Sequence, residues 1–178
     1  TQYPEISQAF SRQLVQELAQ VTSALGYEQE RSVALRPYLV TKAQRGIVGT
    51  SRYAVRLREQ IREAAADRKS VDIFGEPGLE KDNIAALIHF GSPKRREPII
   101  KVNCGILQTS GADLFGRAGG KPGLLEWLGE GTLVLNNIQE LPEELLSPVT
   151  QLLKAGTYTP VSRSGEPPAQ SRPSQARI

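Results

Sequence analysis

A lysine in a glycine-bearing turn is the first feature of this chain that suggests chemistry. The turn follows the apolar run at 71–74 and precedes a helix-like segment at 83–90. Turns of this kind at the amino end of a helix hold phosphate groups with backbone N–H groups and a lysine. The sequence therefore predicts a nucleotide-binding P-loop, whose cofactor-binding residues would be Gly75, Glu76, Pro77, Gly78, Leu79, Glu80, Lys81 and Asp82.

Two adjacent amides form the second feature. An apolar stretch typical of a buried strand leads into Asn136 and Asn137. At this point a P-loop ATPase presents carboxylates that arrange magnesium and activate the attacking water. An amide cannot accept the proton of that water, and losing a general base typically costs roughly a hundredfold to ten-thousandfold in rate. The sequence therefore predicts the frame of an ATPase site with no catalytic residue and no metal site.

Alternating periodicities predict the elements that must position these residues. They indicate helices near 4–25, 51–67, 83–90 and 142–155, and strands near 71–74, 98–102 and 132–138. Helices and strands in alternation form a parallel sheet between layers of helices, so we expect a three-layer α/β fold of the P-loop NTPase type. Ligands bind at the carboxyl ends of such strands, where Glu80 and Asn136 should lie close together.

Composition sets the broad class of the protein. The 178 residues are 39% hydrophobic and 23% charged, which suits one core with appendages. The single cysteine, Cys104, excludes an internal disulfide, so we expect the cytoplasm or the cytoplasmic side of a membrane-attached protein. A net charge of +3 gives only weak support for nucleic-acid binding. Because the chain begins at Thr1 and lacks methionine, we expect a piece of a longer protein.

Short motifs spread over much of the chain resemble one family. They are Gly46–Ser51, Gly75–Gly78, Ile88–His89, Val102–Cys104, Asp113–Gly116, Gly131–Leu133 and Leu152–Thr157. Together they resemble the AAA+ domain of sigma-54-dependent transcription activators. The resemblance implies a nucleotide-binding domain that, in active members, forms a ring and remodels the sigma-54 polymerase.

The resemblance also suggests how the chain is divided. Residues 1–45 would be an amphipathic helix and linker, and residues 46–163 the AAA+-like core. Residues 164–178 would be a proline- and serine-rich tail leading to a missing strand, so the domain would be truncated at its carboxyl end. Segment 4–14 is similar to the last helices of a cyclic-nucleotide-binding domain of the catabolite-activator type, which would place a sensor domain ahead of Thr1.

The first departure from the family pattern is Glu80. Active members have glycine there, because the backbone must pass close to the phosphates. A carboxylate about 4 Å from a phosphate oxygen would cost roughly 4 kcal/mol at an effective dielectric of about 20, or about a thousandfold in affinity. Lys81 could neutralise phosphate or pair with Glu80, and the structural role is favoured. Asp82 stands where the family commonly has an acid. We therefore expect no cofactor or weakly bound ATP or ADP.

Two further departures concern catalysis and the partner. Asn136 and Asn137 match the family's Asp-Glu pair, and Asn103 matches the asparagine that restrains the catalytic glutamate. The partner of Asn103 would therefore be an amide in place of the catalytic glutamate. Active members also carry a long excursion with a Gly-Ala-Phe-Thr-Gly-Ala motif that touches sigma-54, whereas this chain has only residues 117–130 at that place. Contact with sigma-54 is therefore not expected.

The remaining polar candidates have structural interpretations. His89 has no second histidine or nearby cysteine with which to form a metal site, and Cys104 shows no sign of an activating base. The charge run at 94–96 is typical of a solvated surface. Lys121 lies in a glycine-rich loop that could bind an anion but is interpreted as a shortened connection, and Trp127 is assigned to the core or an interface.

The sequence as a whole favours a degenerate AAA+ domain that serves as a non-hydrolysing regulatory or scaffolding module in a signalling or transcription-regulatory protein. Two alternatives stay open: a working ATP-dependent activator of the sigma-54 class, and a DNA-binding module. The expected partners are other domains of the same longer protein, with a homo-oligomer as a further option. Direct nucleic-acid binding is not expected.

Overall fold

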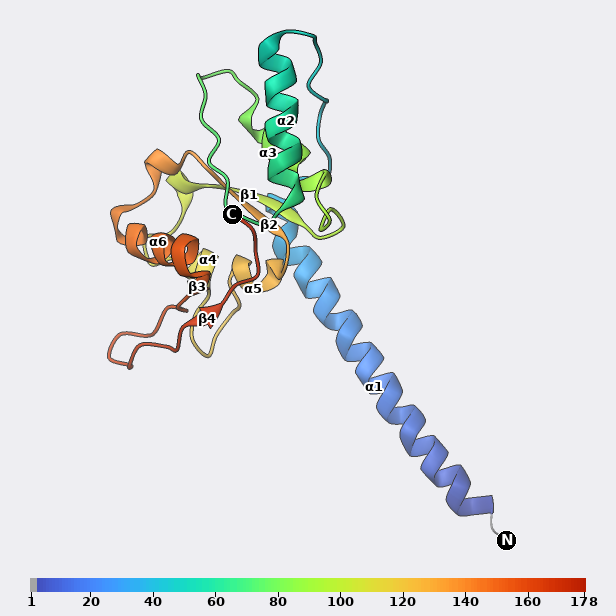
Figure 1. Ribbon diagram of the computed structural model, residues 1–178. Coiled ribbons are helices and arrows are strands. Elements are labelled where there is room, and N and C mark those ends of the chain that lie inside the picture. Colours follow the sequence, from blue (N-terminus) through green and yellow to red (C-terminus); the bar gives the residue numbers. More distant parts are fainter. Residues whose placement is uncertain (1–2) are drawn as a thin grey trace.

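The computed structural model describes residues 3–178. Helix α1 projects from the body, and its first turn lies at the far end (Figure 1). None of the helices within residues 3–178 combines the length and apolar character needed to cross a bilayer. The α-helices and strands are α1 (Tyr3–Leu35), α2 (Arg52–Ala66), α3 (Lys81–Phe90), β1 (Ile99–Asn103), α4 (Ala112–Phe115), α5 (Leu124–Leu128), β2 (Thr132–Asn136), α6 (Leu146–Ala155), β3 (Thr157–Tyr158) and β4 (Arg172–Pro173).

Strands β1 and β2 pair in parallel and form the centre of the body. Their register places Ile99 opposite Thr132 and Asn103 opposite Asn136. Both strands are rich in isoleucine, valine and leucine, which suits a sheet covered on both faces. Figure 1 shows α2 and α3 on one side of the strands and α4, α5 and α6 on the other. The three-layer α/β arrangement predicted from the sequence is confirmed.

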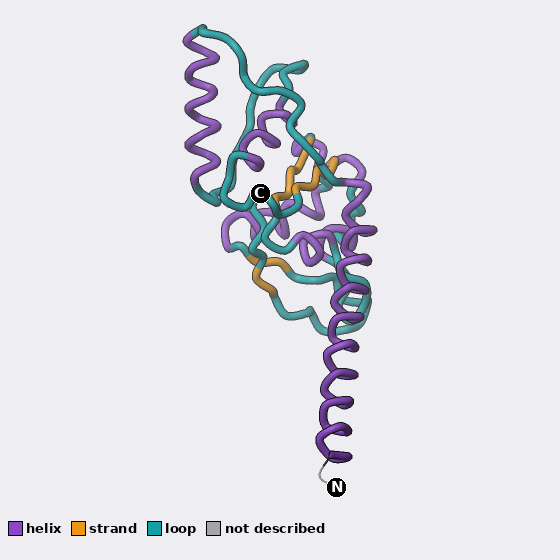
Figure 2. Tube along the Cα trace, turned by 90° about the vertical axis from the view of Figure 1, so that its right-hand side faces the viewer, coloured by secondary structure: helices purple, strands orange, loops and turns teal. Residues whose placement is uncertain are grey.

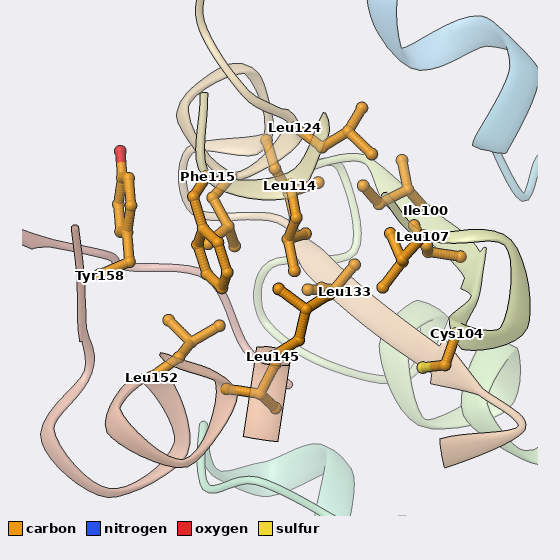
Figure 3. Packing of buried hydrophobic residues seen from close by; sticks show 14 of the residues in the cluster. Ile100, Cys104, Leu107, Leu114, Phe115, Leu124, Leu133, Leu145, Leu152 and Tyr158 are labelled. Carbon is orange, nitrogen blue, oxygen red and sulfur yellow. The ribbon is translucent and has the colours of Figure 1, made fainter. Parts of the chain in front are cut away.

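One apolar cluster fills the space between the strands and helices α4, α5 and α6 (Figure 3). Leu114 and Leu128 are fully enclosed, and the Phe115 ring stacks on Tyr158 with centroids 6.1 Å apart. Burying each leucine contributes roughly 1.5–3 kcal/mol, so this cluster fixes β2 against the helices. Cys104 lies within the cluster, and burial raises the pKa of its thiol. The packing role predicted for this cysteine is confirmed.

The segment 71–74 is not a strand, contrary to the sequence prediction. It runs beside the last residues of the chain, where the N–H of Val71 donates to the carbonyl of Ile178 over 3.1 Å. Arg177 in turn forms a parallel bridge with Thr132 of β2. Across the described residues, Val71 is the one position of this segment with such a backbone partner. Residues 71–74 have the apolar pattern of a strand, but they lack the series of backbone hydrogen bonds to a neighbouring strand that would make them one.

Helix α1 ends at Leu35 rather than near residue 25. Gly26 directly follows the predicted end at residue 25, yet glycine inside a helix costs only about 1 kcal/mol relative to alanine. Beyond that glycine, Arg31 hydrogen-bonds to the body and Leu35 is buried there. Packing of the last turns therefore outweighs the local signal for a helix end.

The other boundaries are closer to the prediction. Helix α2 begins after Ser51, whose hydroxyl accepts a hydrogen bond from the N–H of Ala54 and so caps the helix. The last predicted helix starts later than expected, because Glu143–Leu145 form a 3-10 turn before α6. Gly156 ends α6 in the left-handed conformation, with φ of 65°. The proline- and serine-rich tail includes β4, which pairs with β3.

His89 joins α3 to the sheet. Its Nε2–H donates to the carbonyl of Glu97 over 2.8 Å, and the hydroxyl of Thr132 donates to its Nδ1 over 2.8 Å. The side chain is 1% exposed, and no metal-ligating cluster occurs within residues 3–178. Burial lowers the pKa of His89, with Arg68 and Arg177 adding to the effect. The structural role predicted for this histidine is confirmed.

The free energy of unfolding should fall as the pH drops below about 6.5. Because the folded-state pKa of His89 is lowered, the unfolded chain takes up a proton that the folded chain resists. This contribution is complete above the unfolded pKa and is lost as the pH falls towards the folded pKa. Urea denaturation at pH 7 and pH 5 measures the loss, which should be smaller in His89→Gln. An equal loss in both proteins would assign the pH dependence to other groups.

Candidate functional site

The turn before α3 keeps the outline of a P-loop. Gly78 adopts φ of 89°, a conformation that glycine reaches readily and other residues rarely do. The carbonyl of Glu80 accepts hydrogen bonds from the N–H groups of Asn83 and Ile84, so helical bonding begins there. The Nζ of Lys81 donates to the carbonyl of Gly75 over 2.9 Å, which folds the lysine back over the turn. The lysine thus contacts the backbone of the turn in which it lies.

Glu80 is paired with an arginine from a distant part of the chain. The Nε of Arg45 donates to one carboxylate oxygen and its Nη2 lies beside the other, each over 2.9 Å. Fork-to-fork pairs of this kind are the strongest arginine–carboxylate geometry, although both side chains here are partly exposed. The pair that the sequence suggested, between Glu80 and Lys81, is not formed. Arg45 neutralises the carboxylate that occupies the P-loop.

Asn83 ties the connector between α1 and α2 to α3. Its Oδ1 accepts from the N–H groups of Gln44 and Arg45 over 2.8 and 3.3 Å, and its Nδ2 donates to the carbonyl of Arg45 over 2.7 Å. The side chain is 5% exposed. An amide satisfied on both sides by one short stretch of backbone holds that stretch in a defined place. We call Arg45, Glu80 and Asn83 the connector latch.

Asn83→Ala should lower the free energy of unfolding by about 2 kcal/mol, because the three hydrogen bonds between the buried Asn83 side chain and the backbone of residues 44 and 45 are lost. This corresponds to a fall in Tm of roughly 4–8 °C, measurable by thermal denaturation. Asn136→Ala is the matched control, since the described structure gives that side chain no hydrogen bond, and it should stay within about 0.5 kcal/mol. Equal losses in the two variants would contradict the latch.

The amides lie where β1 and β2 end. Asn103 and Asn136 face each other in the register, and Asn137 follows in the left-handed conformation with φ of 54°. The Nδ2 of Asn137 donates to Oδ1 of Asn103 over 3.5 Å, and that same oxygen accepts from the N–H of Gly105 over 3.0 Å. Asn103 and Asn137 therefore contact each other as amides, and at 3.5 Å this contact is a weak one.

A carboxylate absent from the sequence-based site stands close to these amides. Glu140, in the 3-10 turn after β2, places its side chain against the backbone of Gly105. Its negative charge also helps to raise the pKa of Cys104. The only sequence signal for Glu140 was that it lies three residues after Asn137. Nothing in the sequence indicated that its side chain would turn back towards Asn103.

One crevice joins the P-loop turn to the strands. A cavity of about 280 Å³ is bordered by Glu80 and Lys81 on one side and by Lys101 and Val134 on the other. The Nζ of Lys101 in β1 donates to Oδ2 of Asp82 over 2.7 Å, which draws the start of α3 onto the strands. The turn and the two strands thus surround a single space. The predicted closeness of Glu80 and Asn136 stays a prediction.

Residues 47–176 match the family described as the sigma-54 interaction domain. The chain belongs to this family. It is similar to a signal-transduction and transcriptional-control protein of Clostridium beijerinckii, with 35% identity over 64% of this chain and 20% of the relative. It is also similar to the transcriptional regulator VasH of Vibrio cholerae, with 31% identity over 77% of this chain and 28% of the relative.

Solved structures agree with this assignment. The structure of NtrX from Brucella abortus in complex with ADP matches with a TM-score of 0.63 and 27% identity, over 93% of this chain and 34% of that one. The same protein in complex with ATP matches with a TM-score of 0.62 and 26% identity. The chain spans between 20% and 34% of the length of these relatives and structures.

This sigma-54 interaction domain has a short connection at 117–130 that contains an element the sequence did not indicate. Helix α5 occupies its second half, and Leu124, Leu125 and Leu128 of that helix are buried in the core. Lys121 and Trp127 border a shallow groove beside α1. The second half of this connection is therefore packed into the body, whereas residues 119–122 of the first half are exposed.

Proposed function

We propose that this sigma-54 interaction domain is a non-hydrolysing regulatory or scaffolding module of a longer transcription-regulatory protein. The observation that carries the proposal is the cluster of amides at the end of β2. Asn136 and Asn137 offer no group that can accept a proton from water, and Asn137 contacts Asn103 instead of a carboxylate. A domain with this fold can hold neighbouring domains in place and pass movements between them. It lacks the carboxylates that ATP hydrolysis needs.

The P-loop supports weak nucleotide binding at most. Glu80 brings a negative charge to the place where phosphate would lie, and its counter-charge, Arg45, is engaged in the ion pair. Lys81 is held by the carbonyl of Gly75. ATP or ADP would have to displace both contacts, so we propose no cofactor or a weakly bound one. We place the module in the cytoplasm, in line with its single buried cysteine.

The partners we propose are other domains of the same longer protein. Residues 117–130 form a short connection whose second half, helix α5, is packed into the core, and this shortness argues against direct contact with sigma-54. A DNA-binding role has little support, because Lys94 of the basic run pairs with Glu130 over 2.7 Å. The active-ATPase alternative is favoured by the family assignment alone.

A phosphate-release assay on the purified chain tests the proposal. ATP hydrolysis should be no faster than in a buffer blank, in the presence or absence of magnesium. The outcome that would sink the proposal is turnover approaching about one per second, the lower end of typical enzyme rates, abolished by Lys81→Ala. That result would restore the interpretation of the chain as a working ATPase.

A further inference from the structure

A groove lies between the last turns of α1 and the connection at 117–130. Its volume is about 570 Å³, and the surface that lines it is mostly apolar. One side comes from residues 29–34 of α1 and the other from residues 121–127. We call it the α1–α5 groove, and its lining residues are Gln29, Glu30, Val33, Ala34, Lys121, Pro122 and Trp127.

Two aromatic rings meet at this groove and are held in place by the body. The Tyr27 ring lies 5.2 Å from the Trp127 ring at an angle of 40°, and Tyr27 keeps 50% of its surface exposed. Arg31 donates to the carbonyls of Trp127 and Leu128 over 2.6 and 3.2 Å. Figures 1 and 2 both show that only these last turns of α1 lie beside the body. Because the rings are already fixed, a ligand would lose little free energy in ordering them.

The chemistry of the α1–α5 groove fits a polyproline II segment. Such a segment has three residues per turn and forms no internal hydrogen bonds, so its carbonyls accept from outside donors. The indole N–H of the half-buried Trp127 is a donor of this kind. Aromatic grooves bind proline rings in this way, whereas β-strand addition needs the edge of a sheet. The two sides of this groove are helix α1 and residues 121–127, which contain no strand.

Charge on the α1 side of the groove narrows the choice of segment. Glu30 borders the groove and is exposed, and the carboxylate of the nearby Glu28 is 3.9 Å from Arg31. A basic residue next to the prolines would therefore meet negative charge that is poorly compensated. Lys121 lies on the opposite side, so the charges of the two sides also favour one direction of the segment.

We propose that the α1–α5 groove binds a proline-rich segment of a partner protein. The segment lies in the polyproline II conformation, with its proline rings on the aromatic pair and an arginine beside Glu30. The aromatic residues provide most of the affinity, since tryptophan and tyrosine dominate the binding energy of protein interfaces. The arginine adds specificity more than affinity, because Glu30 is exposed to solvent.

Fluorescence titration of the native chain tests this binding, because Trp127 is the only tryptophan. The probe is the peptide Arg-Pro-Pro-Pro-Pro-Pro-Pro-Pro, which should change the emission in a saturable way with a dissociation constant of about 100 μM or below. Tyr27→Ala should raise this constant about tenfold. Tyr53→Ala is the matched control, since this tyrosine of α2 is also exposed but lies outside the groove, and it should leave the constant unchanged.

Glu30→Gln tests the charge separately from the aromatic contact. It should raise the dissociation constant of the arginine peptide about two- to fivefold, the usual effect of an exposed ion pair. A peptide with glutamine in place of arginine should bind the native chain and Glu30→Gln equally well. Far-UV circular dichroism should be alike in all of these variants, which separates loss of binding from loss of the fold.

The proposal is overturned if millimolar peptide leaves the emission unchanged, or if Tyr27→Ala and Tyr53→Ala give equal dissociation constants. Equal binding of a peptide with glycine and serine in place of the prolines would also overturn it, because that peptide is a flexible coil. Tighter binding of an amphipathic helical peptide of leucine and lysine would assign the α1–α5 groove to a helical partner instead.

Discussion

Replacing Glu80 by glycine is expected to tighten ATP binding by up to about a thousandfold. The carboxylate lies at the amino end of α3, and at about 4 Å it would repel a phosphate charge by roughly 4 kcal/mol. The substitution also frees Arg45, which adds a cation beside the turn. Calorimetric titration of both proteins with ATP and magnesium measures the change. The native chain should bind weakly or not at all.

Arg45→Ala is the control for this experiment. It removes the counter-charge of Glu80 and leaves the carboxylate in place, so any residual binding of ATP should become weaker still. The prediction is contradicted by micromolar binding to the native chain that Glu80→Gly leaves unchanged. In that case Glu80 would point away from the phosphates, and the domain would be a nucleotide sensor.

Hydrolysis should appear only when both amides are converted to carboxylates in a chain that can bind ATP. The triple variant Glu80→Gly, Asn136→Asp, Asn137→Glu is expected to release phosphate roughly a hundredfold to ten-thousandfold faster than Glu80→Gly alone, the usual contribution of a general base. Asn136→Asp also restores a ligand suited to magnesium. A continuous phosphate-release assay with saturating ATP compares the two proteins.

Lys81→Ala added to the triple variant should remove this activity, because the lysine is the retained phosphate ligand of the turn. Asn137→Gln in the Glu80→Gly background changes the side-chain length without adding a proton acceptor and should stay inactive. Equal rates for Glu80→Gly and the triple variant would show that the two amide positions do not limit the reaction.

The elements that carry their own periodicity could be predicted from the sequence. Helix α2 and strands β1 and β2 lie within two residues of their predicted bounds, since a capped helical stripe and a short apolar run are local signals. The segment 71–74 shows where this fails. It has the composition of a strand, but a ladder also depends on its neighbour, and only Ile178 reaches Val71. The predicted end of α1 came about ten residues too early, because Gly26 is a local signal for a helix end. The packing of Leu35 against the body is not visible in the local sequence.

The candidate site likewise contains residues that local motifs predict and contacts that they do not. The P-loop residues and the three asparagines follow from the order of short motifs along the chain. Their charge partners do not, because Arg45 lies 35 positions from Glu80, and a pairing between distant side chains leaves no periodic trace. The adjacent pair of Glu80 and Lys81 was the natural expectation, and it was wrong because the lysine reaches the carbonyl of Gly75.

The segment between α1 and the connector latch determines where a mechanical load on α1 would be felt. Between the helix and the latch, Leu39 bridges Ile100 and the N–H of Val40 donates to the carbonyl of Ile99 over 2.9 Å. A pull or twist applied along α1 therefore reaches the edge of β1 before it reaches residues 44 and 45. A movement of the projecting helix would have to displace these contacts with β1 before it reached the turn at 75–82 along the connector.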